Sequence, residues 1–259
     1  MLIRENYHST EMENRYMSQS QYLGFLECEA RQMAILRGDY AKDVSDPLLV
    51  GQYVHAWNEG RRDQFMADHP DMFTKQGNLK ATFQCGDKMI ATLERDPFCM
   101  WMLEGQKEKV FTAHFAGCEW KILVDVHNAE RGRMVDLKTT RSISEKGWSE
   151  ELWARVSFVE LYKYLLQAAL YCEIERLASQ RDKCLDFYVV AVSKENVPDK
   201  AIIDLRDPDR YVMELQTVQE NMPRILAVKN GTEKAARCEK CDYCRSTKVL
   251  TGAVFYADL

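Results

Sequence analysis

The 259-residue sequence lacks any long hydrophobic segment. No apolar run approaches the roughly 18 residues that a membrane-spanning helix needs, and the first eleven residues contain no apolar signal-peptide core. These two absences exclude a membrane protein and predict a cytoplasmic location. Internal repeats and low-complexity segments are also missing, which excludes a solenoid and long compositionally biased tracts.

An excess of positive charge is missing as well. The formal net charge is -5 and the isoelectric point is about 5.7. This balance argues against a protein that coats nucleic acid, because neutralised phosphates supply most non-specific affinity. A local basic strip could still steer nucleic acid, and the alternative is a merely solvated tail. The candidates cluster near the C-terminus: Arg237, Lys240, Arg245 and Lys248.

The cysteines do not form an even set. Nine of them, in a chain without a secretory signal, indicate reduced thiols or metal ligands rather than a disulfide framework. Hydrophobic residues make up 46% of the chain, enough for a full core. We expect one domain over residues 1–259, with its core at about 46–195.

Two short apolar runs, 121–126 and 133–140, flank a turn-like segment at 128–132 and predict a β-hairpin. If the turn is symmetric, Asp125 lies opposite Asp136, and cross-strand partners share a face with Cβ atoms roughly 5 Å apart. Lys138, two residues further on, shares that face.

Two carboxylates held this close repel each other unless a cation lies between them or one takes up a proton. Mg²⁺ suits the site, since it prefers oxygen ligands and keeps waters for a substrate phosphate. Lys138 could orient an attacking water or offset developing negative charge. The pattern therefore favours phosphodiester hydrolysis, although Asp-x-Lys alone often occurs by chance and a solvated hairpin is the alternative.

With Gln167 and Tyr171 on a helix further along, the D…(D/E)-x-K pattern resembles the PD-(D/E)XK nuclease superfamily, and within it RecB-type domains and phage exonucleases of the RecE type. Further similar stretches lie at 51–60, 79–83 and 238–245. The resemblance covers about 18 to 248. It implies an α/β restriction-endonuclease-like core with helical N- and C-terminal additions, Gln167 and Tyr171 near the active site and the DNA end, and Mg²⁺ or Mn²⁺ as cofactor.

The expected order of elements is helix, three strands, helix, strand. A capping box at Ser18 opens a helix to Arg37, stopped by Gly38, and Asp46-Pro47 opens another that ends near Gly60. Residues 62–100 read as loops and short helices. The expected strands and the last helix follow at 110–115, 121–126, 133–140, 150–179 (helix) and 185–192.

His55 and Glu59 lie four residues apart on the helix after Asp46 and can point at one spot. The resemblance implies that they help to hold metal or position substrate, and an ordinary polar helix face is the alternative. Many relatives carry a glutamate near the end of the 110–115 strand, where this chain places His114. A third acidic ligand is therefore in question.

Cys238, Cys241 and Cys244 form a compact C-x-x-C-x-x-C run that can converge on one metal or cluster. Similar iron–sulfur nucleases close a [4Fe–4S] site with an N-terminal cysteine, and Cys28 is the candidate fourth ligand. The site would join the terminal segments 18–38 and 207–248. Zinc is the runner-up, and uncoordinated thiols are the remaining alternative.

The sequence thus predicts a metal-dependent DNA exonuclease of phage-type recombination, with Asp125 and Asp136 on Mg²⁺ and Lys138 assisting the water. DNA is the expected partner, with a single-strand annealing protein and a homo-oligomer as further possibilities. The alternatives are an inactive DNA-binding or assembly protein with a nuclease fold, and a zinc-stabilised structural module.

Overall fold

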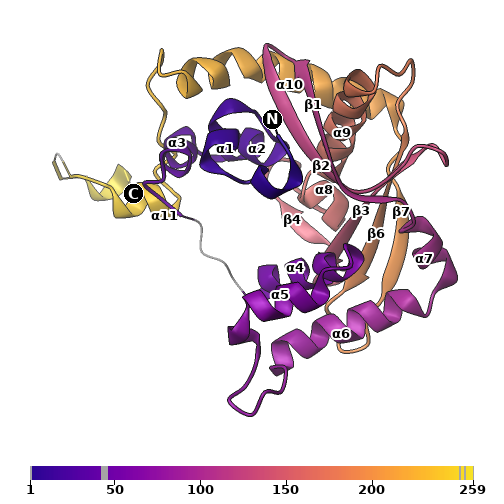
Figure 1. The fold of residues 1–259 in the computed structure, drawn as a ribbon. Coiled ribbons are helices and arrows are strands. Elements are labelled where there is room, and N and C mark those ends of the chain that lie inside the picture. The colour runs from indigo at the N-terminus through magenta and orange to yellow at the C-terminus, as the bar shows by residue number, and fades with distance from the viewer. Residues whose placement is uncertain (1, 42–45, 251, 254, 259) are drawn as a thin grey trace.

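A five-stranded sheet, in the order β1-β2-β3-β6-β7, forms the centre of the structure, a computed structural model that describes residues 2–41, 46–250, 252–253 and 255–258 (Figure 1). Its strands are β1 (Gln106–Phe115), β2 (Cys118–Asn128), β3 (Arg133–Thr140), β6 (Asp186–Ser193) and β7 (Lys200–Asp204). Strands β3 and β6 run parallel, and the other neighbours are antiparallel. A parallel pair needs a long crossover, which here holds β4 (Gly147–Ser149), β5 (Ala154–Val156), α8 (Phe158–Leu161) and α9 (Tyr164–Ala178).

Helices cover both faces of the sheet. This follows from the sequence of β3 and β6, in which successive residues point to opposite faces and both sets are apolar. Met134 and Phe187 belong to the core shared with α9 and α10 (Pro208–Lys229), while Val135 and Val190 belong to the core shared with α4 (Asp46–Asn58) and α6 (Ala81–Glu94). The first layer also takes in α2 (Gln19–Glu27) and α3 (Glu29–Arg37). The remaining helices are η1 (Arg4–Asn6), α1 (Thr10–Arg15), α5 (Arg62–Asp68), η2 (Pro70–Met72), α7 (Pro97–Met102), α11 (Asp242–Ser246) and η3 (Tyr256–Asp258).

The expected order of helix, three strands, helix and strand is confirmed as α4, β1 to β3, α9 and β6, with helical additions at both ends. The predicted stops are also present: Gly38 and Gly60 have φ angles of 79° and 72°, a region that favours glycine. Strand β7 was not anticipated. Among the described residues, no helix is both long and apolar enough to cross a membrane.

Several predicted boundaries were wrong. The helix expected over 18–37 breaks at Cys28, whose extended backbone (φ -166°, ψ 106°) ends α2 and whose sulfur caps α3 by accepting the Arg31 N–H. Of the helix expected from 150, the long part begins only at Tyr164. The residues before it form β5 and the short α8, and Lys163, with a left-handed φ of 57°, separates α8 from α9. Residues 62–100 include the fourteen-residue α6.

Candidate active site

The regular pairing of β2 with its two neighbouring strands is interrupted at Asp125, and we call this interruption the kink. The β2–β3 register, Val126 opposite Val135, is the one the symmetric turn predicts, but the paired residues end there, one step before Asp125 and Asp136. On the other side, β1 and β2 pair on both sides of Glu108 and Asp125 but not at them. Glu108 has a φ of 51°, an uncommon value for a residue with a side chain and one that often marks functional sites.

The kink turns the Asp125 side chain towards β3. Its Oδ2 accepts the Leu137 backbone N–H at 2.8 Å and lies 3.5 Å from His55 Nδ1. Ile122 and Val124 face the α9 side of the sheet, whereas Val126 faces the α4 side. The usual alternation of a strand is therefore broken at this carboxylate.

Asp136 is held from two sides. Gln167 of α9 donates from Nε2 to its Oδ1 at 2.7 Å, and Lys138 Nζ lies 2.8 Å from its Oδ2. The Lys138 ammonium also lies 4.9 Å from the centre of the Tyr164 ring. Tyr171 lines the same small cavity as Asp136 and Gln167, so both residues expected from α9 border the strand residues.

The structure brings three ligand groups together: atoms of His55, Glu108 and Asp125 lie within 4.8 Å of one another. Glu108 was missed from sequence: His114 was placed where many relatives carry a glutamate, which left a third acidic ligand in question, whereas the acidic group beside Asp125 is Glu108. His114 is largely exposed and pairs with Glu119 at 3.1 Å, because it lies at the far end of β1 from the kink.

Glu59, the other expected ligand, faces arginines. Its Oε2 accepts Arg4 Nη2 at 2.8 Å and Arg61 Nε at 2.7 Å. It nevertheless lines the same cleft as Glu108 and Asp125. A metal role for Glu59 stays a prediction.

The acidic groups raise one another's pKa values. Burial, followed by repulsion from Asp125 and Glu59, raises the pKa of Glu108 to about 8. Burial also raises the pKa of Asp125, with His55 opposing and Asp136 adding to the shift. For Lys138, burial disfavours the charge, but Asp136, Tyr164 and Asp125 together outweigh it and the pKa is raised. The lysine therefore stays protonated.

This charge pattern fits a divalent cation. Buried carboxylates that crowd without enough positive charge take up protons, and a metal ion between them would remove that penalty. Two carboxylates and an imidazole make a suitable donor set for Mg²⁺ or Mn²⁺. Asp136 lies outside the group of three, with Gln167 and Lys138 as its partners.

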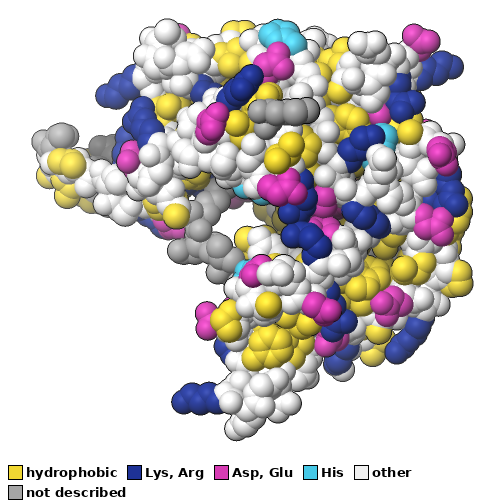
Figure 2. All heavy atoms as spheres, in the orientation of Figure 1, with side chains coloured by type: hydrophobic (Ala, Val, Ile, Leu, Met, Phe, Trp, Pro, Cys, Tyr) yellow, Lys and Arg dark blue, Asp and Glu magenta, His cyan; other side chains and the backbone are white. Residues whose placement is uncertain are grey.

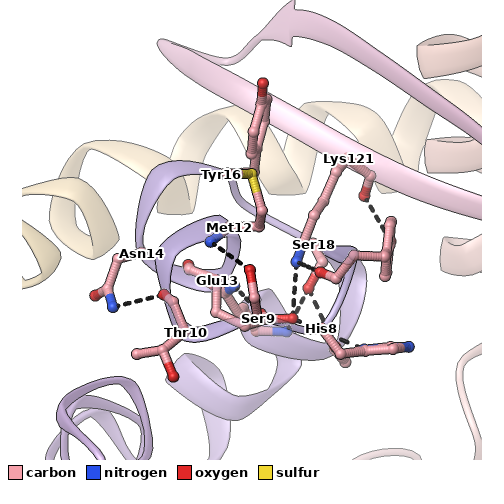
Figure 3. Close-up of polar contacts among 12 residues, drawn as sticks. His8, Ser9, Thr10, Met12, Glu13, Asn14, Tyr16, Ser18 and Lys121 are labelled. Carbon is pink, nitrogen blue, oxygen red and sulfur yellow. Dashed lines mark hydrogen bonds and ion pairs between the residues drawn. The ribbon is translucent and has the colours of Figure 1, made fainter. Parts of the chain in front are cut away.

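The site opens into a cleft of about 930 Å³ lined by residues of α4, β1, β2 and β3, together with Arg4 and Lys194. In Figure 2, acidic and basic side chains lie side by side along a central hollow on this face. The N-terminal segment forms one wall, and Lys121 of β2 fixes it by pairing with Glu13 at 2.8 Å (Figure 3). Tyr7 and His8 of this segment border the cavity that holds Asp136.

The four expected cysteines meet at a second place. The sulfurs of Cys28, Cys238, Cys241 and Cys244 lie within 4.8 Å of one another, with 3.5 Å between Cys28 and Cys244. Backbone N–H groups of Lys240 and Cys241 lower the pKa of Cys238 to about 6, whereas burial raises the pKa of Cys241. Cys238 therefore ionises readily to the thiolate that binds metal, and the convergence of the four sulfurs fits a metal centre.

The α/β core has Asp125, Asp136 and Lys138 on adjacent strands, with Gln167 bonded to Asp136. This arrangement is typical of the PD-(D/E)XK nuclease superfamily. Within it, residues 18–247 match the model of a family described as a PDDEXK-like domain of unknown function (DUF3799). The chain belongs to this family.

A solved structure agrees over the whole chain. It is a crystal structure of a candidate exonuclease from Eubacterium rectale, with 38% identity and a TM-score of 0.93, covering 100% of this chain and 97% of that one. A second structure, SSO0001, has 12% identity and a TM-score of 0.30 over 87% of this chain and 92% of its own, too distant to inform the site. No curated protein matches the chain. Family and neighbour together support a nuclease.

Proposed function

We propose that the protein is a metal-dependent DNA exonuclease that hydrolyses phosphodiester bonds during end processing in phage-type recombination. The observation that carries this proposal is the convergence of Asp125, Glu108 and His55 in one open cleft, which Lys138, the partner of Asp136, also lines. The exonuclease assignment is supported by the description of the Eubacterium rectale structure as a candidate exonuclease.

Each side chain has a part in the proposed reaction. Asp125, Glu108 and His55 would hold a divalent ion, with Asp136 beside them, and such an ion would polarise a phosphoryl oxygen and lower the pKa of a bound water. Lys138 keeps its proton beside Asp136 and offsets negative charge on the reacting phosphate. Gln167 holds the Asp136 carboxylate in place, and Tyr171 borders the space that the DNA end would enter.

An inactive DNA-binding or assembly protein is the second candidate. The complete set of Asp125, Asp136 and Lys138 argues against it, because a buried carboxylate with a raised pKa, such as Asp125, costs stability at neutral pH. A single-strand annealing protein and a second copy of the chain remain proposed partners. The intact site favours the enzyme.

For the cysteine group we propose a [4Fe–4S] cluster, which the C-x-x-C-x-x-C spacing and the remote Cys28 favour. One observation favours zinc instead. Zn–S bonds of about 2.3 Å at tetrahedral angles place sulfurs about 3.8 Å apart, and the Cys28–Cys244 and Cys238–Cys244 separations are 3.5 and 3.9 Å. A four-iron cluster is larger than one zinc ion, so the four cysteine sulfurs would have to move apart to hold it.

The metal content of the cysteine group is tested by purification without oxygen, with measurement of iron, sulfide and zinc. Brown protein with about four iron and four sulfide per chain supports the cluster. Colourless protein with one zinc replaces it by the alternative. Activity is tested with labelled DNA in Mg²⁺ or Mn²⁺, where release of nucleotides from the ends supports an exonuclease and internal cuts in closed circles contradict it.

A further inference from the structure

The β4–β5 hairpin presents aromatic side chains to solvent. Trp148 and Trp153 are 53% and 80% exposed, and Leu152 is 52% exposed. The two indole rings lie 6.3 Å apart, nearly perpendicular. Exposed apolar groups that gather in one place mark interaction surfaces, and the candidate hydrolytic site makes no use of these three side chains.

The hairpin is held firmly despite its short strands. Leu152 donates its N–H to Ser149 Oγ at 3.2 Å, and Glu151 pairs with Lys163. A Cβ atom on Gly147 would lie 2.4 Å from Leu161 of α8, so the hairpin backbone packs directly on that helix. Trp153 has a φ of 47°, which a bulky residue adopts only where its surroundings impose it.

A second group of aromatic side chains lies between the hairpin and the cleft, at the end of α8, the helix on which the hairpin packs. Tyr162, 55% exposed, lines the cleft together with Asp125 and Lys138 and also lines an adjoining groove with Arg141. The Tyr164 ring lies 6.0 Å from that of Tyr162 and 4.9 Å from Lys138 Nζ. Aromatic faces therefore extend outwards from Lys138, and Leu161 joins this segment to the hairpin.

Charge on this segment is balanced. Residues 141–163 contain four basic side chains, Arg141, Lys146, Arg155 and Lys163, and four acidic ones, Glu145, Glu150, Glu151 and Glu160. Such a segment gains little from neutralising the phosphates of a duplex. Aromatic rings instead bind bases by stacking, which tolerates any sequence.

We infer that Trp148, Trp153 and Tyr162 stack on unpaired bases, so that the substrate of the proposed nuclease is DNA with a single-stranded end. This inference rests on the proposed function, because a nuclease site in the cleft implies that the strand passes from the hairpin to the cleft. Bases inside a duplex are covered on both faces by their neighbours, and only an unpaired strand offers free faces to the indoles.

The test measures binding of fluorescein-labelled oligothymidine without added Mg²⁺ or Mn²⁺. Loss of one stacked base should weaken binding roughly 5- to 150-fold in Trp153→Ala. Trp153→Phe should keep most of the affinity, because a ring remains. Phe98→Ala, which removes a 57% exposed aromatic on α7, is the matched control and should bind as the wild type does. Thermal denaturation checks that each variant is folded.

An abasic oligonucleotide completes the test. Wild-type protein should bind it less tightly than oligothymidine, whereas Trp153→Ala should bind the two nearly equally. Equal affinity of wild type and Trp153→Ala for oligothymidine overturns the inference. So does a Trp153→Ala variant that binds normally but changes its sedimentation, which makes the hairpin a self-association surface. Cleavage is measured separately with Mg²⁺, so that loss of the stacking role with activity intact leaves the proposed function standing.

Discussion

Glu108→Gln should stabilise the metal-free protein and weaken its metal binding at the same time. The pKa of Glu108 is about 8 in the folded chain, against about 4.3 in an unfolded one. An acid whose pKa is raised by folding contributes a cost that is absent below the unfolded pKa and grows as pH rises towards the folded one. The window is therefore about pH 4.3 to 8.

The magnitude follows from linkage. Between pH 6 and pH 8 the cost of the Glu108 carboxylate grows by about 2 kcal/mol, and its side chain is only 10% exposed, so solvent screening is small. Glutamine removes the titration and keeps the shape. Arg4 retains Glu59 as a partner at 2.8 Å, so the substitution leaves no unpaired arginine.

The assay is thermal denaturation of both proteins at pH 6 and pH 8, without divalent ions and with Mn²⁺. The melting temperature of Glu108→Gln should exceed that of wild type by a margin that grows by roughly 4–8 °C over this range, and Mn²⁺ should raise it less than it raises wild type. Glu119→Gln, at an exposed carboxylate beside His114, is the control. A margin that stays constant with pH, or a destabilised Glu108→Gln, refutes the reasoning.

Other predictions concern the metal, the positioning of Asp136 and the cysteine group. Mg²⁺ or Mn²⁺ should support DNA cleavage and Ca²⁺ should not, since calcium takes a larger and looser shell; equal rates in all three would count against a catalytic metal. Gln167→Leu removes the donor to Asp136 and should lower kcat roughly 10- to 100-fold with an unchanged melting temperature; an unchanged kcat would contradict its positioning role. Cys28→Ser should lower the melting temperature by roughly 5 °C or more, because ligation joins distant segments, and Cys85→Ser should change it far less; equal effects would argue against a shared metal.

The β2–β3 hairpin could be predicted because the pattern that specifies it is local. Two apolar runs around a symmetric turn determine the register, and the structure has Val126 opposite Val135 as expected. The meeting of Cys28 with Cys244 was predicted from a family resemblance and not from spacing, since 216 residues separate them. Local pattern alone carries no signal over that distance.

Glu108 could not be found in this way. Strand β1 begins with polar residues, Gln-Lys-Glu-Lys at 106–109, which read as a loop before the apolar stretch that follows. The side chain reaches the site only because its backbone adopts a positive φ opposite Asp125, and a strained conformation imposed by tertiary packing leaves no trace in hydrophobic periodicity. In the structure, the raised pKa values of Glu108 and Asp125 mark Glu108 as part of a candidate site.

The β4–β5 hairpin escaped prediction for a related reason. Residues 150–156 look helical by spacing, yet they form a turn after β4 (Gly147–Ser149) and then the three-residue strand β5 (Ala154–Val156). Trp153 and Lys163 both adopt left-handed φ angles, and neither residue type signals this conformation in sequence. Gly147 packs closely against Leu161, a tertiary contact that residue spacing does not reveal.

The central claim is most directly tested by incubating end-labelled DNA with purified protein in Mg²⁺ or Mn²⁺, alongside Asp136→Asn and Lys138→Ala. Both side chains project into the site, so both variants should fold with melting temperatures near that of wild type. Wild-type protein should degrade the DNA and both variants should lose at least about 100-fold in rate. The account would be contradicted if wild-type protein left the DNA intact in both Mg²⁺ and Mn²⁺, or if both variants cleaved at the wild-type rate.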